Sequence, residues 1–223
     1  MSRSGADDTA LDTLQSTQPP GVLITTSALP KFYSNGLDLS HASSTPTFWT
    51  DALYPLWRKL LSFPMPTVAL LNGHAFAAGL MLAMFHDYRI MNPQKGFVCL
   101  NEVDFGALLK APMSSIFREK VPAATYRGLV LEGKRFTGPE ALEGGIVDGL
   151  GGLEAALELV QKKKILEKGQ SGVYGMLKVE MYRETWSYLT DEGFAVEDKK
   201  EKELLLRDDE EKERMSRKKV ARL

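Results

Sequence analysis

Short apolar runs rich in β-branched residues alternate with amphipathic segments in the first half of the chain. The runs predict buried strands at 21–26, 67–71, 88–91 and 97–100. Apolar residues spaced three, four and seven apart predict a helix over 46–63, and a run of small residues predicts a buried helix over 75–85. Residues 27–44 are rich in Ser, Gly and Asn and are expected to form a loop. The alternation predicts an α/β fold with a parallel sheet.

The second half of the chain is expected to be helical from Leu108 onward. Thr137 and Glu140 have the spacing of a capping box at the start of one helix. Residues 153–166 have the periodicity of an amphipathic helix. The tail 191–223 holds eleven acidic and ten basic residues of alternating sign, which predicts an exposed helix with many ion pairs.

Length, charge and cysteine content indicate which binding partners and which cellular compartment to expect. With 223 residues the chain can bury a substantial core as one domain. Its formal net charge of −1 gives no electrostatic reason to expect binding to nucleic acid or to an anionic membrane. No apolar run approaches the ~20 residues needed to cross a bilayer. A single cysteine, Cys99, suits a reducing compartment. The three histidines have no metal-ligand spacing, so no metal is expected.

Three segments carry residues suited to chemistry. They are Lys31-Phe-Tyr-Ser-Asn-Gly-Leu-Asp-Leu39, Asn72-Gly-His-Ala-Phe-Ala-Ala-Gly79 and Leu100-Asn-Glu-Val-Asp-Phe-Gly106. The small residues of the first two would let backbone N–H groups approach a ligand, although a plain loop and close helix packing would also need them. In the third, Glu102 and Asp104 lie among apolar residues, which raises the pKa of a carboxyl towards that of a general base. An exposed acidic loop is the alternative for that segment.

Taken in order, these segments resemble the crotonase superfamily of enoyl-CoA hydratases and isomerases. KFYSNGLDL, PTVALLNGHAFAAGLMLAMFHDY, NEVDFG and the later RFTGPEALEGGIVDGL are similar to four family motifs, most closely to those of the plant and fungal peroxisomal Δ3-Δ2-enoyl-CoA isomerases. The resemblance implies a crotonase-like ββα spiral at 21–160 and a charged C-terminal helical segment at 161–223. Residues 1–20 are then expected to be the irregular remnant of a truncated N-terminal region.

The resemblance also implies a site. Two backbone N–H groups, those of Asn35 and Ala78, would form an oxyanion hole for the thioester carbonyl, and Glu102 would be the catalytic carboxylate. Further substrate-binding positions implied by the motifs are Ser34, Gly36, Leu37, Asp38, Ala77, Gly79 and Met81. Asp104 is a competing base, because on an extended segment its side chain would face the same side as that of Glu102.

The implied reaction depends on Met81, which stands where family hydratases carry a second carboxylate. Methionine cannot activate water, so the pattern favours isomerisation of 3-enoyl-CoA to 2-enoyl-CoA in fatty-acid β-oxidation, through a proton shift by one carboxylate. An enoyl-CoA hydratase, a secondary-metabolite acyl-CoA enzyme and a catalytically weak paralogue acting as an assembly partner are the alternatives. No cofactor is expected beyond the coenzyme A of the substrate.

Assembly and location follow from the resemblance and from the C-terminus. The family forms trimers or hexamers, which predicts a homo-oligomer that binds an acyl-CoA thioester without entering a membrane. The last three residues, Ala221-Arg222-Leu223, have the small–basic–Leu form of a peroxisomal address. Peroxisomal location is therefore predicted, with the cytoplasm as the alternative.

Overall fold

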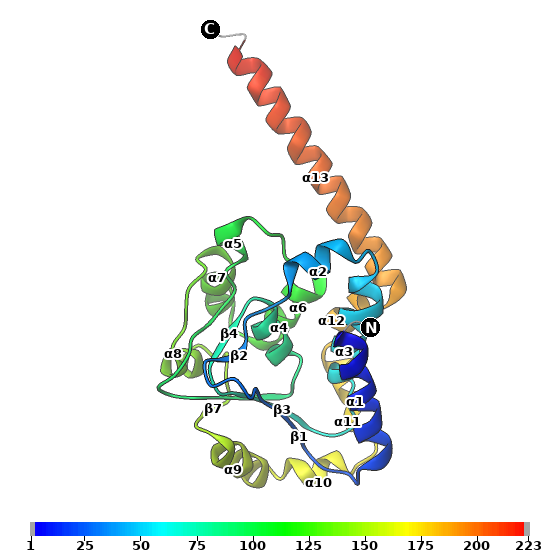
Figure 1. Ribbon diagram of the computed structural model, residues 1–223, viewed down its shortest axis with the longest axis vertical. Coiled ribbons are helices and arrows are strands. Elements are labelled where there is room, and N and C mark those ends of the chain that lie inside the picture. Colours follow the sequence, from blue (N-terminus) through cyan, green and yellow to red (C-terminus); the bar gives the residue numbers. More distant parts are fainter. Residues whose placement is uncertain (1–2, 221–223) are drawn as a thin grey trace.

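In a computed structural model, residues 3–220 are described, with side chains for 10–215 and 217. Within these residues, seven short strands form two parallel sheets surrounded by helices (Figure 1). One sheet has the order β1 (Leu23–Thr25), β3 (Thr67–Leu71), β5 (Tyr88–Met91) and β7 (Gly149–Leu150). The other has the order β2 (Phe32–Ser34), β4 (His74–Phe76) and β6 (Val98–Cys99). The chain thus visits the two sheets in turn, and this α/β spiral confirms the predicted fold class.

The first helices lie between and beside the sheets. They are α1 (Arg3–Thr17), α2 (Leu39–Ser44), a π-helical turn (Trp49–Leu53), α3 (Tyr54–Leu61), α4 (Ala78–Met84) and α5 (Glu102–Phe105). The later helices are α6 (Ala111–Lys120), α7 (Ala123–Leu131), α8 (Gly138–Glu143), α9 (Leu153–Lys163), α10 (Ile165–Gly169), α11 (Tyr174–Met181), α12 (Arg183–Tyr188) and α13 (Asp191–Val220). In Figure 1 α13, drawn in orange and red, runs away from the rest of the chain. No helix among residues 3–220 is both long and apolar enough to cross a membrane.

The main core lies between α3, α4 and the two sheets. Trp57 and Phe85 are fully buried and stack with ring centroids 4.7 Å apart. Every residue of β3 is buried, because helices or strands cover both of its faces. A second, smaller apolar cluster joins Val68, Ile90 and Ala156, where α9 covers the other face of the larger sheet. These contacts fix α4 and the smaller sheet, on which the candidate site is built.

The strands at 21–26, 67–71, 88–91 and 97–100, the helical 46–63 region, the capping box at Thr137 and the long charged helix of the tail are confirmed. The expected loop over 27–44 is wrong, because it contains β2 and α2. The helix expected over 75–85 starts only at Ala78. Its first residues form β4, because pairing with β2 and β6 on both sides outweighs the helix preference of alanine.

Two further expectations are also corrected. Residues 3–17 form the helix α1 instead of an irregular remnant, and buried Leu11 holds α1 against the main core. The helix predicted over 153–166 is interrupted at Lys164, whose φ of 52° lies in the left-handed region and separates α9 from α10.

Candidate functional site

The three motif segments meet at one edge of the smaller sheet. Its strands β2, β4 and β6 are parallel, with β4 in the middle. Asn35 follows the end of β2, Ala78 follows the end of β4, and Glu102 follows the end of β6. Because the carboxyl ends of parallel strands lie at the same edge of a sheet, all three positions gather there. This edge is where α/β proteins bind ligands.

Glycines allow the first two segments to approach closely. A Cβ atom on Gly79 would lie 2.5 Å from the backbone oxygen of Ser34, so only glycine fits between β2 and α4. Gly36 has a φ of 99°, which L residues rarely adopt, and a Cβ there would lie 3.6 Å from the backbone nitrogen of Ala78. The turn after β2 is therefore in contact with the first residue of α4.

Two backbone N–H groups are free at this contact. Within residues 3–220, neither the N–H of Asn35 nor that of Ala78 donates to an acceptor, whereas the neighbouring N–H of Ala77 donates to the Cys99 oxygen at 3.0 Å. Ala77 turns the chain into α4 with φ 49° and ψ −126°, a costly conformation for a residue with a Cβ. The next N–H, that of Ala78, belongs to the first turn of α4, where no carbonyl of the helix itself can accept it, so it is available to a ligand.

Glu102 is a buried carboxylate that lacks a partner. Its residue is 9% exposed, and its Oε2 atom is covered and has no hydrogen-bond partner among the described residues. Burial raises the pKa of the Glu102 carboxyl above its ordinary value of 4.5, and a hydrogen bond with its own backbone only partly offsets this. A buried acceptor without a partner costs stability, so it calls for a functional explanation.

Asp104 lies on the other side of the same helical turn. The expectation that the two acids share a side assumed an extended segment, and this is wrong because α5 spans both residues. Two positions along an α-helix are about 200° apart, so the side chains point in nearly opposite directions. Asp104 is exposed, in contrast to buried Glu102. The geometry therefore separates the two carboxylates, with only Glu102 facing inward.

Glu102 lines a cavity of about 410 Å³ whose walls come from α5, α6 and α7 and the loop between α5 and α6. The lining residues are Leu100, Glu102, Val103, Gly106, Ala107, Leu108, Leu109, Ser114, Tyr126 and Val130. Most are apolar, so a carboxylate in this cavity is poorly hydrated and an alkyl chain would find apolar contacts. The volume falls within the range of small-molecule sites.

The remaining predicted site residues divide into two groups. Ser34, Gly36, Ala77 and Gly79 lie together at the contact between β2 and α4. The others lie elsewhere: Met81 is 1% exposed within the core, Leu37 packs against that core, and the Oδ1 atom of Asp38 accepts a hydrogen bond from the His41 N–H at 3.0 Å as the cap of α2. Of all the predicted site residues, Glu102 alone is among the described residues that line its cavity.

Sequence reasoning missed part of the cavity wall. Ser114 lies on α6 and Tyr126 on α7, and both line the space beside Glu102. Neither belongs to a motif, and nothing in their local sequence distinguishes them from surface residues of amphipathic helices. Only the packing of α6 against α7 and α4 brings them to the cavity.

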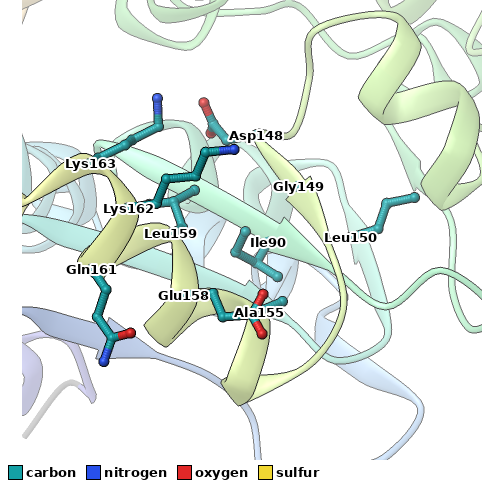
Figure 2. Close-up of a pocket in the computed structure, with 10 residues that line it drawn as sticks. All are labelled: Ile90, Asp148, Gly149, Leu150, Ala155, Glu158, Leu159, Gln161, Lys162 and Lys163. Carbon is teal, nitrogen blue, oxygen red and sulfur yellow. The ribbon is translucent and has the colours of Figure 1, made fainter.

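A wider hollow of about 840 Å³ lies apart from this site, between β5, β7 and α9. Figure 2 shows charged side chains of both signs around it, among them Asp148, Glu158 and Lys162. Asp148 is already paired with Arg89 at 2.8 Å. None of the predicted site residues contributes to this hollow, so it does not carry the chemistry of the motifs.

The histidines have structural surroundings. His86 is fully buried, its Nε2 atom lies 2.9 Å from the Thr25 hydroxyl, and burial lowers the pKa of His86 to about 3. His74 Nδ1 accepts a hydrogen bond from the Phe97 N–H at 3.0 Å. In the described part of the chain, no group of three or more His, Cys, Asp or Glu residues is arranged to hold a metal.

Two free N–H groups and a buried carboxylate without a partner lie at the same edge of a parallel sheet, a set of groups suited to acid–base chemistry next to a carbonyl. The sequence profile of the enoyl-CoA hydratase/isomerase family matches residues 8–217. The chain belongs to this family, and the resemblance to the crotonase superfamily is thereby confirmed.

Relatives and solved structures agree with the assignment. The chain is 39% identical to enoyl-CoA delta isomerase 1, peroxisomal, of Arabidopsis thaliana over 73% of this chain and 71% of that protein. It is 34% identical to enoyl-CoA delta isomerase 2, peroxisomal, of the same plant over 78% and 79%. A probable enoyl-CoA hydratase of Mycobacterium tuberculosis shares its fold with TM-score 0.75, 23% identity and coverage of 91% and 88%. Human mitochondrial delta3-delta2-enoyl-CoA isomerase does so with TM-score 0.67, 22% identity and coverage of 92% and 87%.

Proposed function

We propose that this protein is an enoyl-CoA isomerase that converts 3-enoyl-CoA to 2-enoyl-CoA in fatty-acid β-oxidation. The observation that carries the proposal is the buried carboxylate of Glu102, whose Oε2 atom has no partner in the described structure and which lines a largely apolar cavity. The names of the plant relatives, enoyl-CoA delta isomerases, support the same reaction.

The N–H groups of Asn35 and Ala78 act on the thioester carbonyl. Removal of a proton from C2 places negative charge on the carbonyl oxygen, and two preorganised donors stabilise that charge. Each such donor contributes roughly 3–4 kcal/mol in comparable sites. Their freedom from other hydrogen bonds supports this role, because a donor already in use would have to break a bond before it could act.

Glu102 transfers the proton. Its carboxylate takes the C2 proton, the dienolate spreads its charge to C4, and the same carboxyl returns the proton there. The double bond therefore moves from C3–C4 to C2–C3, and no atom is gained or lost. One base is sufficient for both steps, and its raised pKa brings it closer to that of the carbon acid.

Met81 supports isomerisation over hydration. It occupies the position of the second hydratase carboxylate and is 1% exposed in the core, as are its buried neighbours Leu80 and Phe85. Its apolar side chain cannot position a water molecule as a carboxylate would. An apolar surround also keeps water from the dienolate. The reaction needs no cofactor beyond the coenzyme A of the substrate.

Location and assembly are part of the same proposal. Two plant relatives carry the word peroxisomal in their names, whereas a third, enoyl-CoA delta isomerase 3, does not. Residues 221–223, for which the sequence analysis predicts a peroxisomal address, lie outside the described residues. We propose a peroxisomal homo-oligomer, a trimer or hexamer, and expect import to fail when these three residues are removed.

A direct test compares two substrates and two matched variants. The purified protein is expected to convert 3-enoyl-CoA to the conjugated 2-enoyl-CoA and to hydrate 2-enoyl-CoA much more slowly. Glu102→Gln should lower isomerisation by about 10²–10⁴-fold, the range for loss of a positioned general base. Asp104→Asn, on the exposed side of the same turn, is the control and should retain activity.

Two results would refute the proposal. Full isomerisation by Glu102→Gln would exclude this carboxylate as the base. Hydration as fast as isomerisation would identify a hydratase that works without a carboxylate at position 81.

A further inference from the structure

The cavity of Glu102 contains two hydroxyl groups in an otherwise mostly apolar wall. Ser114 and Tyr126 line it from α6 and α7, and their hydroxyls are hydrogen-bonded to each other. Apart from Glu102, the other side chains that line the cavity, including Leu108, Leu109 and Val130, are apolar. Both residues are half-buried, so a chain bound in the cavity would cover hydroxyls that water can otherwise reach. The protons of the two hydroxyls can be followed through the described contacts.

Arg118 fixes the first part of this arrangement. Its guanidinium donates to the Ser114 hydroxyl oxygen at 2.6 Å, and it is itself held by an ion pair with Glu184 on α12. The Tyr188 hydroxyl donates to the same Glu184 carboxylate at 3.2 Å, which further fixes that acid. Because a guanidinium has only donors, it can satisfy an acceptor of the hydroxyl pair but none of its protons.

One hydroxyl proton is therefore left over. Ser114 and Tyr126 have one O–H each, and their mutual hydrogen bond uses one of these two protons. No acceptor among the described residues takes the other, whichever of the two hydroxyls is the donor. The cavity of Glu102 thus contains a spare hydrogen-bond donor, and the adjacent Arg118 cation strengthens that donor towards an oxygen acceptor.

We propose that the Ser114–Tyr126 pair selects acyl chains that carry an acceptor oxygen, such as a keto or hydroxyl group, beyond the reacting double bond. The inference rests on the proposed function and names the substrate class of the same cavity. A plain alkyl chain in this space would leave the spare O–H without an acceptor and displace any water that served it, whereas an oxygenated chain replaces that water.

The test uses 3-enoyl-CoA thioesters of one chain length, either unsubstituted or with a keto oxygen at successive carbons. A keto group only accepts, so it reports on a donor in the wall. We expect one position in the series to give kcat/KM about tenfold above the unsubstituted chain, the effect of about one hydrogen bond. Equal kcat/KM across the whole series would overturn the proposal.

Substitutions that remove one or both hydroxyl groups test the role of the spare proton. Ser114→Ala and Tyr126→Phe each leave one hydroxyl with a spare proton, so each should retain part of the preference. The double variant has no donor left and should lose the preference, measured as the ratio of kcat/KM for the keto chain to kcat/KM for the unsubstituted chain. Tyr88→Phe, on the larger sheet, is the control for loss of a tyrosine hydroxyl and should keep the full preference. A double variant that keeps the preference would also overturn the proposal.

Failure of the proposed function gives a different result. If neither thioester is isomerised, the affinities of saturated acyl-CoA thioesters with and without the keto oxygen still measure the selection by calorimetry. A tenfold difference in affinity that disappears in the double variant would support the hydroxyl pair as a recognition element even then. Equal affinities would reject it independently of catalysis.

Discussion

The substitution Gly79→Ala tests whether the contact between β2 and α4 sets the spacing of the two free N–H groups. The new Cβ would lie 2.5 Å from the Ser34 oxygen and 2.7 Å from the Ser34 Cβ. An ordinary contact begins at 3.4 Å, so β2 and α4 must separate by about 0.9 Å. Overpacking of this kind costs about 1–3 kcal/mol of stability. A shift of about 1 Å between catalytic groups lowers activity by about 10²-fold.

The expected result is a folded protein whose kcat for 3-enoyl-CoA is about 10²-fold below that of the unmodified chain. Steady-state kinetics gives kcat, and urea unfolding shows that the loss exceeds the small change in the folded population. Gly21→Ala is the matched control, because its Cβ would meet only the Pro19 oxygen at an ordinary 3.6 Å. If kcat of both Gly79→Ala and Gly21→Ala stays within threefold of that of the unmodified chain, the close approach of Ser34 to α4 does not set the spacing of the two N–H groups.

Three further predictions concern the same structure. Because burial raises the pKa of the Glu102 carboxyl, its base form is lost as pH falls through a value above 4.5, and the acid limb of kcat/KM against pH should have its midpoint there, not below. Ala77→Gly should raise the free energy of unfolding by about 1 kcal/mol in urea titrations, since glycine accepts a φ of 49°, and no gain would show that the turn carries no strain. Lys178→Met should lower the free energy of unfolding by about 3–5 kcal/mol, because the buried side chain of Asp87 loses its ion-pair partner at 3.0 Å. Adding Asp87→Asn should recover part of this loss of stability, and an unchanged loss in the double variant would argue against the ion pair.

The fold was predictable where one pattern dominated. The strand at 67–71 is a continuous β-branched and apolar run, and the structure places β3 at the same residues. The prediction failed where the residues are small, because pairing with neighbouring strands then decides between helix and strand. Residues 74–76 are strand because β2 and β6 pair with them on either side, and no local signal for that pairing exists in the sequence.

The site was predictable to a similar degree. The motifs named Glu102 and the two backbone positions at 35 and 78, and the structure brings all three to one sheet edge. Their catalytic roles remain predictions. The hydroxyl pair of Ser114 and Tyr126 could not be found, because it depends on how two helices distant from the motifs pack together.

The sequence by itself determined the family and the chemical types available: one glutamate in an apolar segment, small residues at two turns and a methionine where a second acid would act. These are local properties of residue type and spacing. Only the tertiary structure showed that Glu102 and Asp104 have different surroundings, because a single helical turn after β6 places Glu102 in the cavity wall and leaves Asp104 exposed. It also decided what surrounds the carboxylate, since desolvation and the raised pKa of Glu102 arise from side chains that different helices bring to it.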